Sequence, residues 1–215
     1  MEFEIATTAT HDVYNLLIGL VAPRPIALVT SLNEDGGVNA APFSAYNYLA
    51  IDPPVVGLGI AERSGGGGAE WDARSKDTGR NIRQRGEFVV NVVTEDLMES
   101  MTVTAIDFPA GVSELAEAGL GTVASRMVKV PRIREAHAAL ECVEHATIEV
   151  GRSRIVLGRV VSMWVEDRFV DPAGPYIRAE EMHAMGRMNG QGAYVRTRDA
   201  FVRMDRMTYA DWVKK

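Results

Sequence analysis

Short apolar runs separated by turn signals constrain the fold of this chain more than any other feature. The runs 26–32, 55–60 and 88–93 have the length of strands, and two longer runs flank Gly151. Asp35-Gly36 is a hairpin signal after the first run. The strands do not alternate regularly with long helices, which disfavours a parallel βαβ sheet. We therefore expect antiparallel strands that close into a barrel, which removes exposed edges.

Two short segments have helical character. Residues 78–85 are expected to form a helix that begins after a cap at Asp77 or Ser75 and stops at Gly86. A second helix is expected over 95–106, since four apolar residues share one face of it: Leu97, Met98, Met101 and Ala105.

Length and charge indicate the class of protein. The 215 residues suffice for one core, so a single domain over 1–215 is expected, with a C-terminal extension from about residue 182. The net charge of −6 disfavours nucleic-acid binding, which needs a basic surface. No apolar run reaches the ~18 residues of a membrane span, and the N-terminus lacks a secretory signal. Cys142 is the only cysteine, which favours a reducing, cytoplasmic location and a buried thiol.

The stretch 36–54 has unusually small and polar side chains for a core strand. It is expected to run as one strand, with Pro42 forcing a bend or bulge because it lacks an N–H donor. Ala40, Ala41 and Ala45 leave the neighbouring backbone uncovered. A flat ligand could pack there, with three polar side chains at its edge: Asn39, Ser44 and Asn47.

Two other segments carry groups suited to the same ligand. Lys76, Asp77 and Thr78 stand at a helix start, where free N–H groups and the helix dipole favour an anion. Arg24 precedes a strand that ends in Thr30-Ser31. A flat heteroaromatic ring, a polyol chain and a terminal phosphate would use all three segments, and FMN has these parts. The alternative is that a bulged strand, a capped helix and an exposed arginine are unrelated.

Other catalytic patterns are weak. The chain has no GxSxG motif, and its four histidines lack metal-ligand spacing, so each is interpreted as structural or solvated and no metal is expected. Gly65–Gly68 is not followed by the Lys-Ser/Thr of a phosphate-binding P-loop, and no Rossmann fingerprint occurs.

Three motifs together resemble the flavin reductase-like family of FMN-binding split-barrel proteins: PRPIALVTS, GVNAAPFSAYNYLAIDPP and KDTGRNIRQRGEFVVNVV. Looser similarity continues through DFPAGVSELAEAGL, VPRI, ALECVEHATIEVGRSRIVLGRVV and GRMNGQGAYVRT, and so covers about residues 15–197. The resemblance implies a mainly β fold, a six-stranded antiparallel Greek-key split barrel with short flanking helices. It also implies a homodimer with FMN near the subunit interface, for which VPRI and the C-terminal tail offer apolar surface.

The family's motifs also imply roles for individual residues. The strand Asn39–Ser44, with Tyr46 and Asn47, is expected to line the ring and the polyol chain, and Thr30 and Ser31 to face the same groove. The phosphate end is expected at Ser64 and Lys76–Thr78. The complete expected FMN-binding set is Arg24, Thr30, Ser31, Asn39, Ala40, Ala41, Pro42, Phe43, Ser44, Tyr46, Asn47, Ser64, Lys76, Asp77 and Thr78.

One departure from the family concerns the electron donor. Many flavin reductases have Gly-Asp-His in the hairpin before the last long strand, whereas this chain has Gly151-Arg152-Ser153-Arg154. Arg152 and Arg154 could hold a dinucleotide phosphate instead, or they could be solvated hairpin residues.

The resemblance therefore predicts an FMN-dependent oxidoreductase. It would pass electrons from NAD(P)H to free flavin, oxygen, iron or a partner, and the cofactor supplies this chemistry without an acid–base triad. Two alternatives remain open: an electron carrier without its own nucleotide site, and an FMN-dependent oxygenase acting on a small organic substrate.

Overall fold

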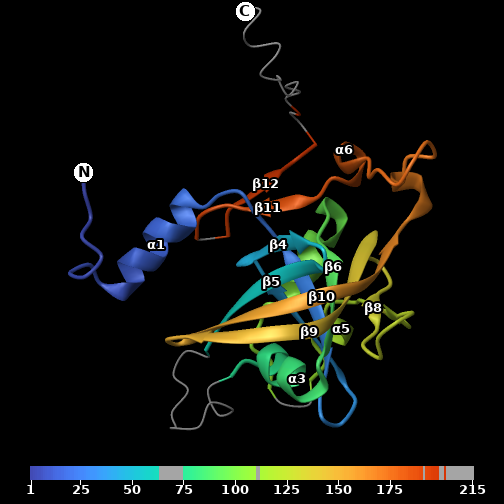
Figure 1. Cartoon of the computed structure of the whole chain (residues 1–215), viewed down its shortest axis with the longest axis horizontal. Coiled ribbons are helices and arrows are strands. Elements are labelled where there is room, and N and C mark those ends of the chain that lie inside the picture. The colour runs from blue at the N-terminus through green and yellow to red at the C-terminus, as the bar shows by residue number, and fades with distance from the viewer. Residues whose placement is uncertain (63–74, 110–111, 191, 199–200, 202–215) are drawn as a thin grey trace, which may run out of the picture.

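A seven-stranded antiparallel sheet forms most of the molecule (Figure 1). The computed structural model describes residues 1–62, 75–109, 112–190, 192–198 and 201. The strand order is β3-β2-β6-β9-β10-β5-β4. The strands are β2 (Ala27–Leu32), β3 (Val38–Phe43), β4 (Tyr46–Ile51), β5 (Pro54–Ala61), β6 (Glu87–Val92), β9 (Ala138–Val150) and β10 (Ser153–Val165).

The two edge strands of this sheet are neighbours in sequence. β3 and β4 lie at opposite ends of the strand order, yet only Ser44 and Ala45 separate them along the chain. So short a connection spans only a few ångströms, and the sheet must therefore curl until its edges approach each other. At this corner the Gly59 N–H donates to the Ala45 carbonyl oxygen over 2.7 Å. The predicted mainly β antiparallel barrel is confirmed, with seven strands in the sheet instead of six because 36–54 forms two strands.

The break within 36–54 is not where the sequence predicts it. β3 keeps an unbroken register with β2, with Pro42 opposite Leu28. The bend or bulge predicted at Pro42 is therefore wrong: β3 ends at Phe43, and the register shift lies between Tyr48 and Ala50, against β5. An edge strand accommodates proline because only one of its sides has a hydrogen-bond ladder to lose.

The two predicted hairpin turns are confirmed. Gly36 has a φ of 86° and Gly151 a φ of 56°, in the left-handed region that favours glycine. The Asn33 N–H closes the first turn on the Gly37 carbonyl oxygen at 2.8 Å. β9 and β10 pair on either side of Gly151.

The barrel interior is closely packed around Phe88 of β6. Phe88 is fully buried, and its ring lies against the backbone of Gly158 in β10. A Cβ atom on Gly158 would stand 2.2 Å from Phe88 Cζ. Cys142 is also fully buried, as predicted. Burial, with the nearby charge of Glu141, raises the pKa of its thiol to about 12, so the thiol remains protonated and unreactive.

The first predicted helix is α3 (Asp77–Arg85). It ends at Gly86, whose φ is 69° and whose N–H donates to the Ile82 carbonyl oxygen. The predicted side-chain cap is wrong. Lys76 occupies the N-cap position with extended backbone, and its side chain makes no capping hydrogen bond. The side chain at the N-cap therefore does not engage the first N–H groups of α3.

The second predicted helix is divided in two. A 3-10 turn, η1 (Glu95–Leu97), leads into α4 (Met98–Val103), and Leu97 and Met101 are buried as expected. The remaining short elements are α5 (Glu114–Glu117), β7 (Thr122–Val123), β8 (Arg132–Ile133), η2 (Asp167–Phe169) and α6 (Ala179–Met182).

Segments from the N-terminal and C-terminal parts of the chain pair beside the barrel. β11 (Met185–Arg187) lies between β1 (Arg24–Pro25) and β12 (Tyr194–Arg196) in a small antiparallel sheet. α1 (Thr10–Leu20), which the sequence reading did not predict, extends away from the barrel (Figure 1) and has no buried residue.

The exposed apolar surface differs from the one expected. Val130 and Ile133 of the VPRI segment are fully buried, so this segment offers little apolar surface to a partner. Exposed large apolar side chains occur on several elements, and those on α1 and β4 include Leu17, Leu20, Tyr48, Leu49 and Ile51.

Candidate functional site

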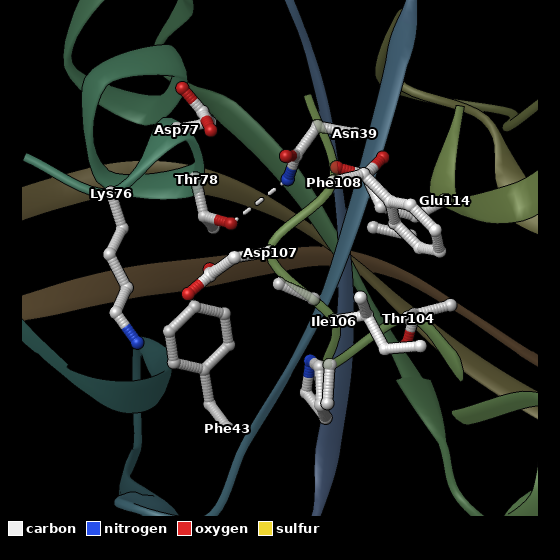
Figure 2. Close-up of a pocket in the computed structure, with 14 residues that line it drawn as sticks. Asn39, Phe43, Lys76, Asp77, Thr78, Thr104, Ile106, Asp107, Phe108 and Glu114 are labelled. Carbon is white, nitrogen blue, oxygen red and sulfur yellow. Dashed lines mark hydrogen bonds between the residues drawn. The ribbon is translucent and has the colours of Figure 1, made fainter. Parts of the chain in front are cut away.

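The α3 pocket lies where the start of α3 faces strand β3 (Figure 2). It is lined by Asn39–Phe43, Lys76–Thr78, Thr104–Phe108 and Glu114. Eight of the fifteen expected binding residues meet here: Asn39, Ala40, Ala41, Pro42, Phe43, Lys76, Asp77 and Thr78. Thr104–Phe108 and Glu114 were not expected, because a contact between segments so distant in sequence leaves no local signal.

A buried amide and hydroxyl network fixes the start of α3 against the sheet. Asn39 Nδ2 donates to Thr78 Oγ1 at 3.0 Å and to Ser31 Oγ at 3.3 Å. Asn81 Nδ2 donates to the same Ser31 oxygen at 3.1 Å and to Asn33 Oδ1 at 2.8 Å. Because each donor is satisfied in a buried setting, the network holds the first turn of α3 in one position.

Two expected groove residues lie behind the pocket rather than in it. Thr30 and Ser31 are fully buried and are not among the residues that line the α3 pocket. Thr30 Oγ1 donates to the Pro131 carbonyl oxygen at 2.8 Å, and Ser31 accepts from Asn39. The expectation that they face the groove is therefore corrected: they support its wall. Ser64 lies outside the described residues.

The charges of the α3 pocket are divided. Lys76 is exposed and is the only cation that lines this pocket among the described residues. The Asp77 carboxylate pairs with Arg80, whereas Asp107 and Glu114 add two further carboxylates to the wall. An anion is thus favoured at the start of α3, beside Lys76 and the first N–H groups of the helix. The carboxylates elsewhere in the pocket can accept hydrogen bonds from hydroxyl groups.

Two further pockets continue from the α3 pocket along the chain from Pro42 to Asn47. The first, which we call the arginine pocket, shares Pro42 and Phe43 with the α3 pocket and is completed by α1 and the β11–β12 hairpin. The second, the β4 groove, contains Ser44, Tyr46 and Asn47. Ser44 belongs to both. The small-residue stretch therefore borders a continuous series of hollows.

Arg24 lines both of these pockets, but most of its guanidinium N–H groups donate to backbone carbonyl oxygens. Its Nη1 donates to the carbonyl oxygens of Ile18 and Val21 at 2.6 and 2.7 Å, and its Nη2 to that of Met188 at 2.6 Å. Its Nε lies 3.4 Å from Ser44 Oγ. Arg24 therefore joins α1, the end of β11 and the β3–β4 corner.

Tyr46 is partly buried and packs against the barrel core. Burial, and to a smaller extent the Cys142 side chain, raises the pKa of its phenol to about 12. The phenol is therefore neutral in the physiological range and can take part in hydrogen bonds without carrying charge.

The two hairpin arginines have carboxylate partners. Arg152 Nε pairs with Glu62 at 3.0 Å, and its side chain is 73% exposed. The Arg154 side chain is only 4% exposed, and its Nη2 pairs with Glu149 at 2.9 Å. Arg154 is therefore not a solvated hairpin residue.

The sequence that forms this barrel and its α3 pocket matches a known protein domain. The flavin reductase like domain matches residues 20–181, which is most of the chain. The chain belongs to the flavin reductase-like family. The split-barrel fold that the motifs imply is therefore the fold of this protein, and its barrel and α3 pocket lie within the matched residues.

Relatives of this family member resemble it over nearly their whole length. An uncharacterized protein of Deinococcus radiodurans is 37% identical over 98% of this chain and 91% of its own. The crystal structure of nitrilotriacetate monooxygenase component B from Bacillus cereus is 30% identical, with a TM-score of 0.85 over 94% of this chain and 98% of that one. The 2-nitrobenzoate 2-nitroreductase NbaA of Pseudomonas fluorescens is 34% identical, with a TM-score of 0.85 over 97% and 98%.

Parts of this flavin reductase-like protein lie beyond the matched domain. α1 up to Gly19, together with β11 and β12, falls outside residues 20–181. These elements supply Tyr14, Arg187 and Tyr194 to the arginine pocket. Among the helices in the described part of the chain, none is long and apolar enough to cross a membrane.

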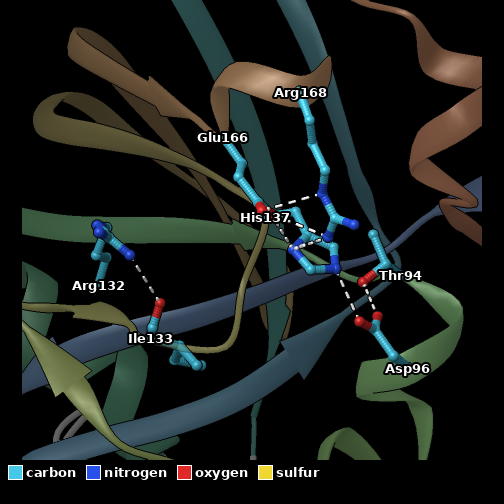
Figure 3. A network of polar contacts seen from close by, with 7 residues as sticks. All are labelled: Thr94, Asp96, Arg132, Ile133, His137, Glu166 and Arg168. Atoms are coloured by element: carbon cyan, nitrogen blue, oxygen red, sulfur yellow. Dashed lines mark hydrogen bonds and ion pairs between the residues drawn. The ribbon is translucent and has the colours of Figure 1, made fainter. Parts of the chain in front are cut away.

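A second polar cluster lies around His137, close to α6 (Figure 3). His137 Nε2 lies 2.7 Å from Asp96 Oδ2, and His137 Nδ1 lies 2.7 Å from Glu166 Oε2. Carboxylates accept hydrogen bonds, and a ring N–H of His137 can donate to either of them. Arg168 also pairs with Glu166. The cluster ties η1 to the segment that precedes α6, and we interpret it as structural.

Asp96 gives this cluster a testable dependence on pH. Burial raises the pKa of Asp96, but hydrogen bonds from Thr94 and His137 and the His137 charge outweigh burial, and the pKa falls below its usual value of 3.8. A lowered folded-state pKa stabilises the protein above the unfolded-state pKa, and this stabilisation is lost as pH falls through the folded value. The unfolding free energy of the native protein should therefore exceed that of Asp96→Asn at pH 7, and the difference should shrink below about pH 4.

Urea unfolding at several pH values measures this difference. Asp12→Asn, which removes an exposed carboxylate from α1, is the matched control. A difference between native protein and Asp96→Asn that stays constant from pH 7 to pH 3 would contradict the prediction.

Proposed function

We propose that this protein is an FMN-dependent oxidoreductase that accepts electrons from NAD(P)H and passes them to free flavin, oxygen, iron or a partner. The observation that supports this proposal most directly is the series of hollows along Asn39–Asn47. This series begins at the start of α3, beside Lys76 and Thr78. A ligand that bound along this series would have its anionic end at α3 and its flat part at the β3–β4 corner.

The residues present suit each part of FMN. The start of α3, where the N-cap residue Lys76 makes no capping hydrogen bond, suits the phosphate. Asp107 and Glu114 can accept hydrogen bonds from the hydroxyls of the polyol chain. Ala45 and Gly59 both line the β4 groove and carry little or no side chain, which suits a ring next to the backbone. When bound, FMN would supply the redox chemistry, while the chain orients it and limits its contact with water.

The function is tested by the visible absorbance of the purified protein, before and after anaerobic addition of NADH or NADPH. The proposal expects a flavin spectrum that either nucleotide bleaches. A protein that cannot be loaded with FMN would refute the proposal as a whole.

An electron carrier without its own nucleotide site is the second candidate. The observation that favours it is that Arg152 and Arg154 pair with Glu62 and Glu149, which reduces their availability to a dinucleotide phosphate. A flavin spectrum that neither nucleotide bleaches would support the carrier over the reductase.

We also propose that the protein acts as a homodimer in the cytoplasm. α1 exposes Leu17 and Leu20, and β4 exposes Tyr48 and Ile51, at 56%, 81%, 71% and 83% of their surface. Exposed apolar residues gathered on two elements are typical of an interface. The one cysteine, Cys142, is a buried free thiol, which is compatible with a reducing compartment.

Charged substitutions should separate the two copies. We expect Ile51→Lys or Leu20→Lys to convert the dimer to a monomer, because burying an unpaired ammonium group at an interface is unfavourable. Met127→Lys, at an exposed apolar residue in a distant loop, should leave the dimer intact. Sedimentation equilibrium at micromolar concentration gives the mass. A native protein that sediments as an FMN-loaded monomer would refute the dimer.

A further inference from the structure

The arginine pocket is built by three parts of the chain that meet only in the folded protein. Its polar side chains are Tyr14 of α1, Arg24 of β1, Ser44 of the β3–β4 corner, and Arg187, Asn189 and Tyr194 of the β11–β12 hairpin. Its volume is about 210 Å³. This is less than the roughly 300–1,000 Å³ of sites for drug-sized ligands. The pocket therefore suits a compound with a single ring.

Two arginines face each other in this pocket. Arg24 and Arg187 are direct partners in the β1–β11 pair, so their side chains leave the small sheet on the same face. Like charges placed directly opposite each other are unfavourable. None of the described residues that line the pocket is an aspartate or a glutamate. The pocket thus carries positive charge that no carboxylate among its described lining residues offsets.

Arg187 is the arginine available to a ligand. Arg24 directs three hydrogen bonds to backbone carbonyl oxygens of α1 and of the residue after β11. The Arg187 guanidinium lies over the Tyr194 ring, with 4.5 Å between Cζ and the ring centroid. Within the described part of the chain Arg187 forms no ion pair. Stacking on Tyr194 holds the guanidinium plane and leaves its N–H edge for an acceptor.

We propose that the arginine pocket binds the carboxylate of a small aromatic acid that accepts two electrons from the reduced flavin, which is thereby reoxidised, with Arg187 as the recognising residue. The planar fork of arginine matches a carboxylate through two parallel hydrogen bonds. Tyr14, Tyr194 and Pro42 provide flat surfaces for the attached ring. The pocket adjoins the β3–β4 corner through Pro42–Ser44, where the proposed function has the flavin ring. The inference rests on that proposed function and names the substrate class.

Part of the arginine pocket is formed by elements outside the matched flavin reductase like domain. Tyr14, Arg187 and Tyr194 lie outside residues 20–181, which match the flavin reductase like domain. The domain by itself does not complete the pocket, so selectivity for an acid would come from the two terminal extensions.

The test uses the full-length protein loaded with FMN. Benzoate is titrated while the visible spectrum of the flavin is recorded, and benzamide serves as the neutral compound of nearly the same shape. We expect benzoate to bind, and Arg187→Gln to weaken it at least about tenfold, because charge-assisted hydrogen bonds to the carboxylate are lost. Benzamide should bind the native protein more weakly than benzoate and should be little affected by the substitution.

Arg196→Gln is the matched control. Arg196 lies on β12 and pairs with Glu95 at 2.8 Å, and it does not line the pocket. Its substitution removes the same charge from the same hairpin and should leave benzoate affinity unchanged. Equal losses in Arg187→Gln and Arg196→Gln would attribute the effect to general charge and overturn the inference.

Flavin loading is measured first, so that the two proposals can fail separately. If FMN binds but benzoate does not, or if benzoate affinity is independent of Arg187, the inference is overturned and the flavin function stands. If FMN does not bind, the flavin function is refuted. Calorimetric titration of the flavin-free protein with benzoate then tests whether the arginine pocket binds an acid. Heat that depends on Arg187 supports an acid-binding pocket, and its absence overturns it.

Discussion

Gly158→Ala is expected to lower the free energy of unfolding by about 3 kcal/mol, the upper end of the usual cost of overpacking a core. The added Cβ would lie 2.2 Å from Cζ and 2.7 Å from Cε1 of the buried Phe88 ring, and 3.3 Å from Cys142 Cβ. Phe88 is fully buried, and a close-packed interior leaves a ring little room to move. Urea unfolding followed by circular dichroism measures the change.

Two further variants assign this loss to the contact with Phe88. Gly174→Ala is the control, because a Cβ at Gly174 meets no atom within 4 Å, and it should be nearly neutral. In the double variant Gly158→Ala/Phe88→Leu the loss should be smaller than the sum of the single losses, because the shorter side chain makes room. Additive losses would show that the clash is not with Phe88.

Lys76→Ala is expected to weaken FMN binding by about 10- to 150-fold while changing riboflavin binding little. The basis is that Lys76 is the only cation lining the α3 pocket among the described residues, and hydrogen bonds to charged groups contribute about 1.5–3 kcal/mol. Riboflavin lacks the phosphate and so should not depend on this charge. Fluorescence titration of both flavins gives the two dissociation constants.

Arg83→Ala is the matched control for Lys76→Ala. Arg83 is an exposed cation in the last turn of the same helix, away from the pocket. It should change FMN binding far less, and the Lys76 effect should shrink at high salt as screening increases. If Lys76→Ala lowered the affinities for FMN and riboflavin equally, Lys76 would not be part of the phosphate site.

Local signals in the sequence were sufficient for the strands and their turns. Asp35-Gly36 and Gly151 mark the two hairpins because a positive φ favours glycine there, and Gly86 marks the end of α3 for the same reason. The burial of Cys142 also followed from its apolar neighbours. These features depend on a few adjacent residues, which is why one sequence is enough to predict them.

Features that depend on distant contacts were not predicted. The turn at Ser44–Ala45 arises because β3 and β4 pair with different strands, β2 and β5. Thr104–Phe108 reach the α3 pocket through the packing of η1 and α4. The burial of Ser31 reflects hydrogen bonds from Asn39 and Asn81, eight and fifty residues away. α1 was also not predicted, although it does not depend on distant contacts. Its apolar periodicity and the proline at residue 23 are local signals of a helix.

Pro42 has a consequence for how the barrel avoids aggregation. β3 is the terminal strand of the sheet, and Pro42, which lies opposite Leu28 of β2, has no N–H to donate on either side of the strand. An open strand edge is a template on which another chain can add a strand, and a proline interrupts that pairing. The residue that separates the α3 pocket from the arginine pocket therefore also protects one edge of the barrel from growing into intermolecular β-structure.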